Sequence, residues 1–284
     1  MSFQPVVPMG GYAGWQFLTR TLASQEAAFD AAPVQQRDTT YFAATIGKVT
    51  SVDQLMADPK LLKVALGAFG LGDQTGSTAL IRKVLTDGTS SATALANQLS
   101  DKRYLALAQA FNFGEDGPPN TQNPGFAATI GKAYQDQQFQ TAVGQQDTNL
   151  QLALQMQSSL ANLASGSGSE ATKWYTVMGT PAMRAVFQTA LGLPSSFVSL
   201  DIDHQLQVFE DKAQQAFGDS SVSQFADPAK IDDLVKRFLV RSDTQSGSQA
   251  SAASIALQLL GGDSSSTTTT GSGGSANTVL SLFS

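Results

Sequence analysis

ADPKLLKVALGAFGLG, residues 57–72, predicts a short amphipathic helix with a defined start and a defined end. The Asp58 carboxylate can accept the free N–H groups of a first helical turn, and Pro59 stands where a missing N–H group costs nothing. Apolar side chains then recur at spacings of three and four, which places them on one face. Gly70 and Gly72 can adopt the left-handed conformation that closes a helix. We therefore expect a fold assembled from short capped helices of this kind.

The same pairing of a capping residue with a large apolar residue recurs along the chain. Phe69 follows Asp58 by 11 positions, and this separation also joins Ser100 to Phe111, Thr180 to Leu191, and Asp227 to Phe238. A single pair is what any capped amphipathic helix would show. Four pairs with one separation favour an internal repeat.

An identical heptapeptide also indicates duplication. FAATIGK occupies residues 42–48 and again residues 126–132, which lie 84 positions later. Seven identical residues predict two related helical halves, and the acidic, proline-rich stretch at 115–120 is the expected boundary between them. The predicted parts are an extended N-terminal arm at 1–10, helical halves at 11–117 and 118–242, and a flexible Ser/Thr/Gly-rich tail at 243–284.

The periodicity of the rest of the chain is helical, without a convincing alternation of period two. We therefore predict an all-α fold, namely a duplicated helical bundle built from repeated short capped helices. One helix is expected over residues 11–32 and ended by Pro33, because proline opposes helix continuation. The longest helical signal covers residues 126–165, with a kink at Gly144 and a new cap at Asp147.

Composition excludes several classes of function. With 17 basic and 23 acidic residues the formal net charge is −6, which argues against a nucleic-acid partner. Charged residues make up only 14% of the chain, and a surface of uncharged polar residues suits packing against protein partners or copies of the same chain. No apolar run approaches the roughly 18 residues of a membrane span, and the N-terminus does not resemble a cleavable signal peptide.

Few residues suggest catalysis or metal binding, since the chain has no cysteine and one histidine. Asp201, Asp203 and His204 could bind a metal ion or transfer protons, but acidic residues in a first helical turn normally cap it. The Gly-Lys pairs at 47–48 and 131–132 resemble the end of a phosphate-binding loop, yet they lack its upstream glycine and its following Ser or Thr. We predict no catalytic, cofactor-binding or metal-binding residue, and a protein that is not an enzyme.

The C-terminal tail is the predicted partner-binding element. Low-complexity sequence from residue 261 onward includes four consecutive threonines at 267–270 and ends in an apolar tip. The candidate contact residues of this tip are Val279, Leu280, Leu282 and Phe283. A polar tether with an apolar tip is typical of a docking peptide, although a frayed terminus has the same composition.

Five stretches, at residues 11–21, 38–42, 61–71, 81–85 and 139–144, together resemble a bacterial family of unknown function. The resemblance covers roughly residues 1–240, and its motifs are helix-packing segments that carry no catalytic residues. The genes of this family lie among flagellar genes, mainly in alphaproteobacteria. The resemblance therefore implies a flagellar role, with flagellar components or copies of the chain itself as partners.

Three hypotheses remain open. The first is a non-enzymatic protein that acts through protein contacts in the structure or assembly of the bacterial flagellum, where such proteins are typically Cys-free and low in charge. The second is a soluble cytoplasmic helical scaffold or chaperone unrelated to motility. The third is an enzyme or small-molecule binder with an unfamiliar site, which a deep pocket with convergent polar groups would favour.

Overall fold

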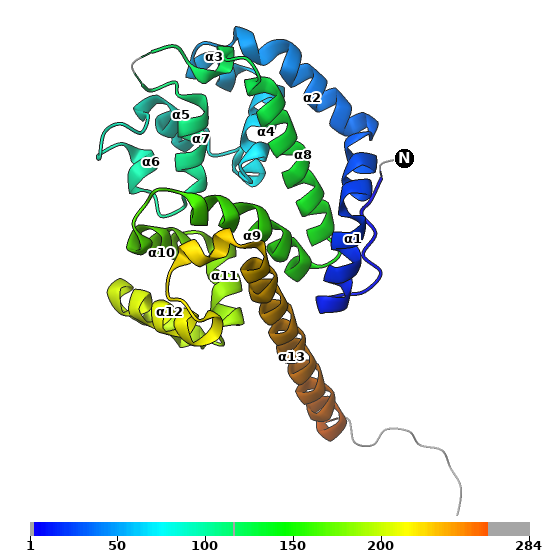
Figure 1. Cartoon of the computed structure of the whole chain (residues 1–284). Coiled ribbons are helices and arrows are strands. Elements are labelled where there is room, and N and C mark those ends of the chain that lie inside the picture. The colour runs from blue at the N-terminus through cyan, green and yellow to red at the C-terminus, as the bar shows by residue number, and fades with distance from the viewer. Residues whose placement is uncertain (1–2, 116, 261–284) are drawn as a thin grey trace, which may run out of the picture. The chain divides into compact units, whose positions relative to one another are not determined.

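The computed structural model describes residues 3–115 and 117–260, and these residues form α-helices joined by short loops and turns (Figure 1). The α-helices of the described residues are α1 (Gly11–Asp30), α2 (Pro33–Thr45), α3 (Val52–Ala57), α4 (Pro59–Ala68), α5 (Thr78–Asp87), α6 (Leu95–Gln98), α7 (Arg103–Phe111), α8 (Phe126–Gly144), α9 (Thr148–Ser165), α10 (Glu170–Gly179), α11 (Pro181–Ala190), α12 (Ile202–Phe217) and α13 (Pro228–Leu260). Short 3-10 helices lie between them: η1 (Ile46–Lys48), η2 (Gly72–Gln74), η3 (Asn120–Gln122), η4 (Ser195–Ser199) and η5 (Val222–Ala226). No strand occurs in these described ranges, so the predicted all-α class is confirmed.

Helix α4 forms as the sequence predicts. The Asp58 carboxylate accepts hydrogen bonds from the N–H groups of Lys60, at 2.9 Å, and Leu61, at 3.2 Å. Seven of the ten residues of α4 are buried. Gly70 adopts a φ of 68°, and the N–H group of Leu71 then bonds to the Leu66 carbonyl at 2.9 Å. This hydrogen bond reaches back over the last helical turn and closes α4.

The other predicted copies of this helix differ from it at their ends. Ser100 does not cap α7, which begins at Arg103, and Thr180 precedes α11 without a side-chain capping bond. Asp227 accepts a hydrogen bond from the Ala229 N–H at 2.9 Å, but the helix that follows does not end after Phe238. The equal separations therefore do not reflect one repeated unit.

The identical heptapeptides also take up different structures. The first copy forms the end of α2 and the 3-10 helix η1, whereas the second forms the first two turns of α8. Ile46 and Ile130 are both buried, yet they belong to the same hydrophobic core rather than to two equivalent ones. The predicted duplication is not confirmed, because the two identical heptapeptides occupy different structural positions in the fold.

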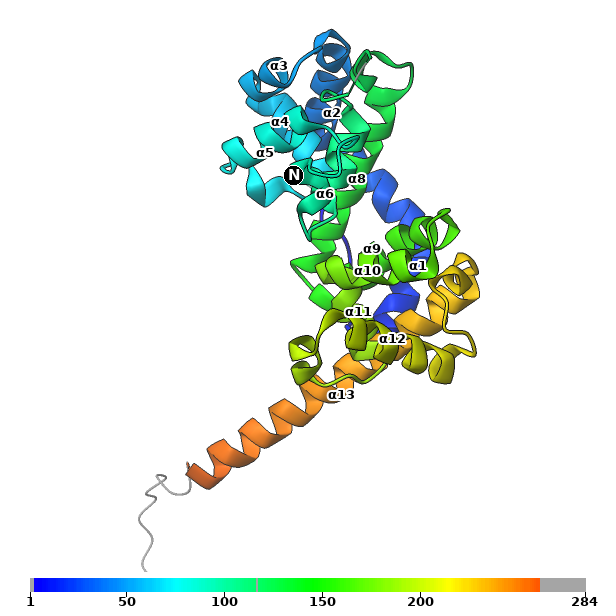
Figure 2. The same ribbon diagram turned by 90° about the vertical axis from the view of Figure 1, so that its left-hand side faces the viewer.

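Two hydrophobic cores lie within residues 3–243. The first joins α2 to α7 and includes Ile130 and Tyr134 from the start of α8. The second includes Trp15 and Phe29 of α1 and runs from Phe139 near the end of α8 to Leu239 of α13. Figure 2 shows α2 to α7 grouped apart from α9 to α12, with α8 shared between the groups. The cores thus divide along α8, and not at the loop 115–120 where the boundary was expected.

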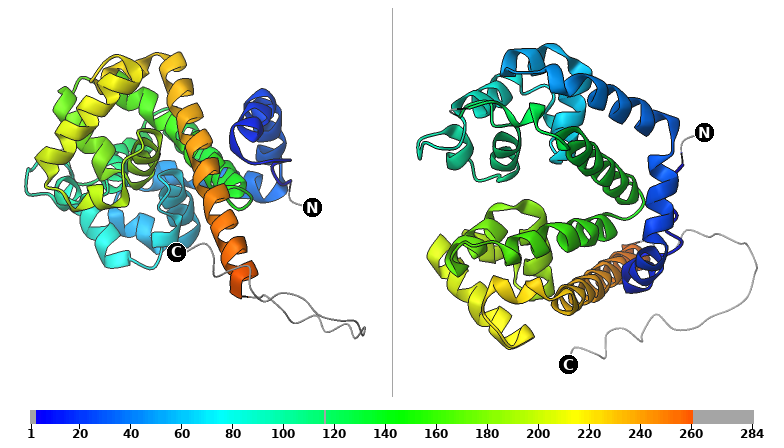
Figure 3. Two further views of the ribbon diagram at one scale, coloured as in Figure 1. Left: turned by 90° about the horizontal axis from the view of Figure 1, so that it is seen from below. Right: turned by 45° about the horizontal axis from the view of Figure 1, so that its top comes forward.

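Helix α1 packs with the second core although it is first in the chain. It ends at Asp30, and Pro33 lies in the first turn of α2, so proline starts a helix here instead of ending one. Figure 3 shows α1 passing along the corner where α8 turns into α9. The carboxylate of Asp147 caps α9 at that corner through the N–H groups of Asn149 and Leu150, as predicted.

The chain divides between Asp243 and Thr244, one residue after the predicted start of the tail. The described residues up to Asp243 pack as one compact unit, and the rest of α13 belongs to a second unit. Helix α13 is continuous across this division and reaches Leu260. The predicted flexible tail at 243–284 therefore begins inside a helix. No helix among the described residues combines the length and hydropathy that crossing a membrane requires.

Candidate functional site

The structure places the predicted site residues as follows. The tail residues Val279, Leu280, Leu282 and Phe283 lie outside the described residues. His204 lies in the first turn of α12, where its backbone N–H group donates to the Asp201 carboxylate at 2.9 Å. The neighbouring Asp203 accepts a hydrogen bond from the Tyr175 hydroxyl at 2.9 Å. Asp201 thus caps the helix, and no group of three or more potential metal ligands is found in the described residues.

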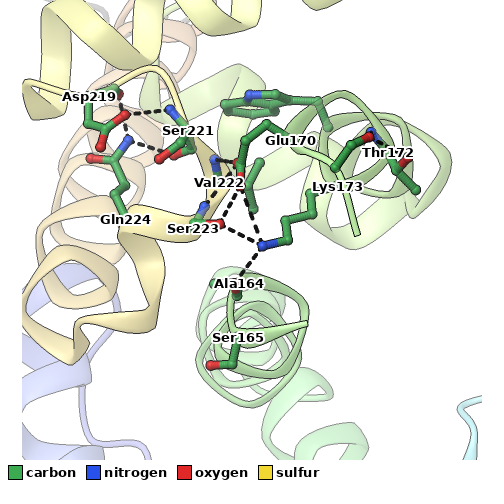
Figure 4. Close-up of polar contacts among 12 residues, drawn as sticks. Ala164, Ser165, Glu170, Thr172, Lys173, Asp219, Ser221, Val222, Ser223 and Gln224 are labelled. Carbon is green, nitrogen blue, oxygen red and sulfur yellow. Dashed lines mark hydrogen bonds and ion pairs between the residues drawn. The ribbon is translucent and has the colours of Figure 1, made fainter. Parts of the chain in front are cut away.

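A buried lysine is surrounded by polar partners, and we call this cluster the Lys173 centre (Figure 4). The Lys173 ammonium group, on α10, donates to the Ala164 carbonyl at 2.8 Å and to the Ser223 hydroxyl at 2.6 Å. It also lies 3.4 Å from the Glu170 carboxylate. Its three N–H bonds therefore have three acceptors, contributed by α9, η5 and α10.

The Glu170 carboxylate is equally well supplied with partners. It accepts hydrogen bonds from the N–H groups of Val222, at 2.7 Å, and Ser223, at 3.2 Å, and also from the Ser223 hydroxyl. Burial raises the pKa of this carboxyl, but the hydrogen bonds from Ser223 and Val222 and the Lys173 charge outweigh burial and lower it. The indole N–H of Trp174 adds a bond to the Ser220 carbonyl at 2.9 Å.

A serine next to a lysine can act as nucleophile and base in hydrolases. Here the Lys173 side chain is buried, donates two hydrogen bonds within the protein and forms an ion pair with a carboxylate. The centre consequently leaves no position at its lysine for a substrate, and its geometry is that of a joint between three segments. The sequence did not reveal it, because Ser223 lies 50 residues after Lys173 and an acid three positions before a lysine is an ordinary helical pair.

An exposed apolar segment leads into the first residue of α12, and we call Val198, Leu200 and Ile202 the 198–202 segment. These side chains are between 41% and 50% exposed, although each is large and apolar. Val198 belongs to the 3-10 helix η4, Ile202 is the first residue of α12, and the backbone at Leu200 and Asp201 between them is extended. Three large apolar residues within a stretch of five are thus exposed to solvent.

The 198–202 segment is held firmly by buried neighbours. Phe197 is buried in the second core, with its ring packed edge-on against Phe209 at a centroid distance of 4.9 Å. The buried Gln205 amide donates to the Leu200 carbonyl at 2.6 Å, and its oxygen accepts from Arg184 of α11, also at 2.6 Å. The backbone that carries the exposed apolar side chains is therefore held in place by contacts within the chain, without a partner.

A cavity of about 710 Å³ lies where α4, α7, α9 and α11 meet. Its lining is largely apolar and includes Phe69, Met156 and Met183. The guanidinium group of Arg103, which lines the same cavity, is paired with the Asp101 carboxylate at 2.7 Å and also donates to the Gly70 carbonyl. This arginine charge is therefore balanced within the protein.

Comparisons with known proteins give a family and a fold. Residues 68–231, more than half of the chain, match a family described as "Protein of unknown function (DUF1217)". An X-ray crystal structure of a protein from Agrobacterium tumefaciens is similar with a TM-score of 0.69 and 27% sequence identity, covering 85% of this chain and 99% of that chain. No curated protein matches the sequence. The structural likeness extends beyond the residues that the family covers.

Proposed function

The chain belongs to the DUF1217 family of proteins of unknown function, and from this premise we propose that it is a non-enzymatic protein that works by binding other proteins. The observation that carries this proposal is the 198–202 segment. Large apolar side chains gain free energy when they leave water, and a rigid backbone lowers the entropy lost on association. A prearranged group of exposed apolar side chains therefore favours a protein contact.

The composition supports the same proposal. Charged residues are only 14% of the chain, and charged residues are depleted at the centres of protein interfaces. The Lys173 centre, which has the side chains that a hydrolase would need, uses them to join α9, α10 and η5. These features favour a binding role over a catalytic one.

The cellular setting that we propose is the bacterial flagellum, as a structural or assembly component. This proposal rests on the resemblance to a family whose genes lie among flagellar genes, together with the Cys-free, low-charge composition. The partners would be flagellar components or further copies of the chain. Cell fractionation separates this role from that of a cytoplasmic scaffold or chaperone, because an exported component must occur in sheared flagella or in the culture medium.

The test is complementation of a gene deletion with variants of the 198–202 segment. We expect the deletion to impair swimming in soft agar and to alter flagella in electron micrographs. The triple variant Val198→Ser/Leu200→Ser/Ile202→Ser should fold, by circular dichroism, yet fail to restore swimming. Unchanged swimming and normal flagella in the deletion strain would refute the flagellar role.

A matched control uses exposed apolar residues elsewhere. Val34 on α2 and Met9 in the N-terminal arm are 45% and 54% exposed, which is similar to the 198–202 segment. The double variant Val34→Ser/Met9→Ser should restore swimming to the level of the unaltered chain. If both variants fail equally, or if the triple variant restores swimming fully, the 198–202 segment is not the contact surface.

A further inference from the structure

The cavity where α4, α7, α9 and α11 meet, which we call the Met156 cavity, is lined from both hydrophobic cores. Phe69 of its lining packs against the first core, and Leu152 packs against the second. Met156 and Met183 belong to the second core and also line the cavity. Its volume of about 710 Å³ is usual for a ligand site, and methionine side chains adapt their shape to an incoming apolar group. An apolar group that enters the cavity therefore contacts both cores.

The polar side chains of this lining are uncharged, with one exception. Gln137 of α8 and Gln155 and Asn162 of α9 line the cavity, and their side-chain amides form no hydrogen bond with the described residues. The exception is Arg103, whose charge is balanced by Asp101. Each free amide has both a donor and an acceptor, so it can pair with the backbone of an inserted segment.

The N-terminal arm of the chain shows how glutamine amides bind such a segment. The Gln25 side chain of α1 accepts a hydrogen bond from the Val6 N–H at 2.6 Å and donates to the Val6 carbonyl at 3.2 Å. The Gln146 amide donates to the Pro5 carbonyl, also at 2.6 Å. Residues 3–8 belong to no helix or strand, so side-chain amides supply hydrogen bonds that regular structure would otherwise provide. The free amides of the Met156 cavity offer the same pairing.

The tip of the C-terminal tail, residues 278–283 with the sequence TVLSLF, matches the cavity in chemistry. It lies outside the described residues, so its match is argued from sequence and length. Four of its six residues are large and apolar, and the other two, Thr278 and Ser281, are uncharged. Burying a charge without a partner is costly, and neither the tip nor the cavity lining brings an unpaired charge.

Three other hollows of the described residues match the tip less well. The pocket between α1, α8 and α9 is lined by the charged side chains of Glu26, Lys132 and Asp136, which an apolar tip would remove from water. The hollow beside Phe17 has a volume of about 280 Å³, less than half that of the Met156 cavity. The groove at residues 33–44 is lined by α2 alone and so has a single wall.

The tail is also long enough to reach the cavity. Val279 follows Leu260, the last residue of α13, by 279 − 260 = 19 positions, and such a stretch spans up to about 65 Å when extended. The 17 residues from Thr244 to Leu260 are helical and cover only about 26 Å. The difference of about 40 Å is more than twice the radius of gyration of about 18 Å expected for a compact unit of this size. The tip can therefore return to the unit that ends at Asp243, whichever way α13 points.

We propose that the tip of the C-terminal tail docks into the Met156 cavity of the same chain. The apolar side chains of the tip fill the space between the two cores, and the free amides of α8 and α9 pair with its backbone. A tethered segment meets its own site at an effective concentration of about 1 mM, so contact within one chain prevails over contact between chains at micromolar concentrations. The cavity shares no residue with the 198–202 segment, so this proposal does not rest on the proposed function.

The experiment is paramagnetic NMR of the full chain, which has six methionines and no cysteine. The substitution Ser284→Cys allows a nitroxide label to be attached next to the tip, and ¹³C-methyl methionine provides the signals. We expect the label to abolish the methyl signals of Met156 and Met183, and reduction of the nitroxide to restore them. The signals of Met9 and Met56, which do not line the cavity, should persist. Persistence of all four signals, or equal loss of all four, would overturn the proposal.

A mixed sample identifies the chain that supplies the tip. It combines chains that carry ¹³C-methyl methionine and no cysteine with chains that carry the nitroxide and no ¹³C. At micromolar concentrations we expect the signals of Met156 and Met183 to persist in this mixture. Their loss in the mixture would show that a second copy supplies the tip, and the docking within one chain would be refuted.

Variants of the tail then test the tip itself. In the nitroxide-bearing chain, Leu280→Ser/Phe283→Ser should restore the signals of Met156 and Met183, because the tip loses most of its apolar surface. The matched control Thr268→Ser/Thr269→Ser alters the tail upstream of the tip and should leave both signals abolished. Signals that stay abolished in the tip variant would contradict docking through its apolar residues.

A variant of the cavity tests the other side of the contact. Ala106 of α7 lines the cavity and is exposed, so Ala106→Glu adds a charge there without disturbing a core. This variant should restore the signals of Met156 and Met183 in the nitroxide-bearing chain. The control Ala43→Glu, at an exposed position of α2 outside the cavity, should leave them abolished. If Ala106→Glu and Ala43→Glu give the same result, the tip does not dock in the Met156 cavity.

Discussion

The Lys173 centre and the polar cluster around Lys132 contain the same kinds of group, and they differ in whether those groups have partners. The second cluster consists of Lys132, Asp136 and Gln140 of α8 with Glu26 and Asp30 of α1. In each, a lysine on a helix lies beside carboxylate groups: Glu170 beside Lys173, and Asp136 and Asp30 beside Lys132. The Lys173 side chain is 6% exposed and has three acceptors for its three N–H bonds, whereas the Lys132 side chain is 54% exposed. Beside Lys132, the Glu26 carboxylate and the Gln140 oxygen are left without partners among the described residues.

The difference distinguishes a polar cluster that connects segments of the fold from one whose groups lack partners. A buried polar cluster whose donors and acceptors all match fixes the segments that contribute them. A cluster with unpaired acceptors and excess negative charge lowers the stability of the fold, and an added positive donor would raise it. By this criterion the Lys173 centre holds α9, α10 and η5 together, whereas the cluster around Lys132 keeps an unpaired acceptor, the Gln140 oxygen, and more carboxylates than basic groups.

The largest expected effect comes from Lys173→Met, which breaks the closed cluster. The variant keeps most of the side-chain volume but leaves the Glu170 carboxylate and the Ala164 carbonyl without the ammonium group. Removing one partner of a buried pair typically costs 3–5 kcal/mol, and because the Glu170 side chain is 39% exposed we expect the lower end, about 3 kcal/mol. Urea unfolding followed by circular dichroism measures the change.

Lys132→Met is the matched control for that measurement. The same substitution at an exposed lysine should change the free energy of unfolding by less than about 1 kcal/mol. If both variants lose the same stability, the Lys173 centre is not the joint that its hydrogen bonds indicate.

The sequence predicted the fold class and the local helix ends well, because these depend on neighbouring residues. Asp58, Asp147 and Asp201 cap helices as their positions indicated. The duplication was not confirmed, because α8 and α2 give one heptapeptide different partners. Which residues meet across a core depends on the packing of whole helices, and short identities carry no information about that.

The candidate sites were harder to predict, and each for its own physical reason. The Lys173 centre needs Ser223, which reaches it only through the turn before α13. Gln140 is one glutamine among many in a Gln-rich helix, and only packing distinguishes a buried oxygen from an exposed one. The apolar residues at 198, 200 and 202 look like core residues in the sequence, since nothing local shows that they face solvent.

A smaller effect of opposite sign is expected for Gln140→Leu. The substitution replaces an unpaired buried acceptor with an apolar group of similar size, which can stabilise a protein. We expect the free energy of unfolding to rise by about 1 kcal/mol, measured by urea unfolding. A fall in stability would mean that the Gln140 amide is already satisfied in the folded chain, and the comparison with the Lys173 centre would fail.

The smallest effects, and the sharpest comparison, come from Glu26→Gln and Glu170→Gln measured against pH. The pKa of Glu26 is raised above its ordinary value of 4.5, so its ionised form destabilises the fold, and this cost appears as pH rises through the folded-state pKa. The pKa of Glu170 is lowered, so its ionised form stabilises the fold above about pH 4.5, and this gain disappears as pH falls through the folded-state pKa.

At pH 7 Glu26→Gln should therefore be more stable than the unaltered chain and Glu170→Gln less stable. Because solvent screens both carboxylates, each difference should stay below about 1 kcal/mol. Thermal unfolding from pH 7 down to pH 3 should bring both variants toward the unaltered chain, from opposite sides. An ionised carboxylate with partners stabilises the fold, whereas one without partners destabilises it. If both variants change the free energy of unfolding in the same direction at pH 7, the two carboxylates have the same electrostatic role.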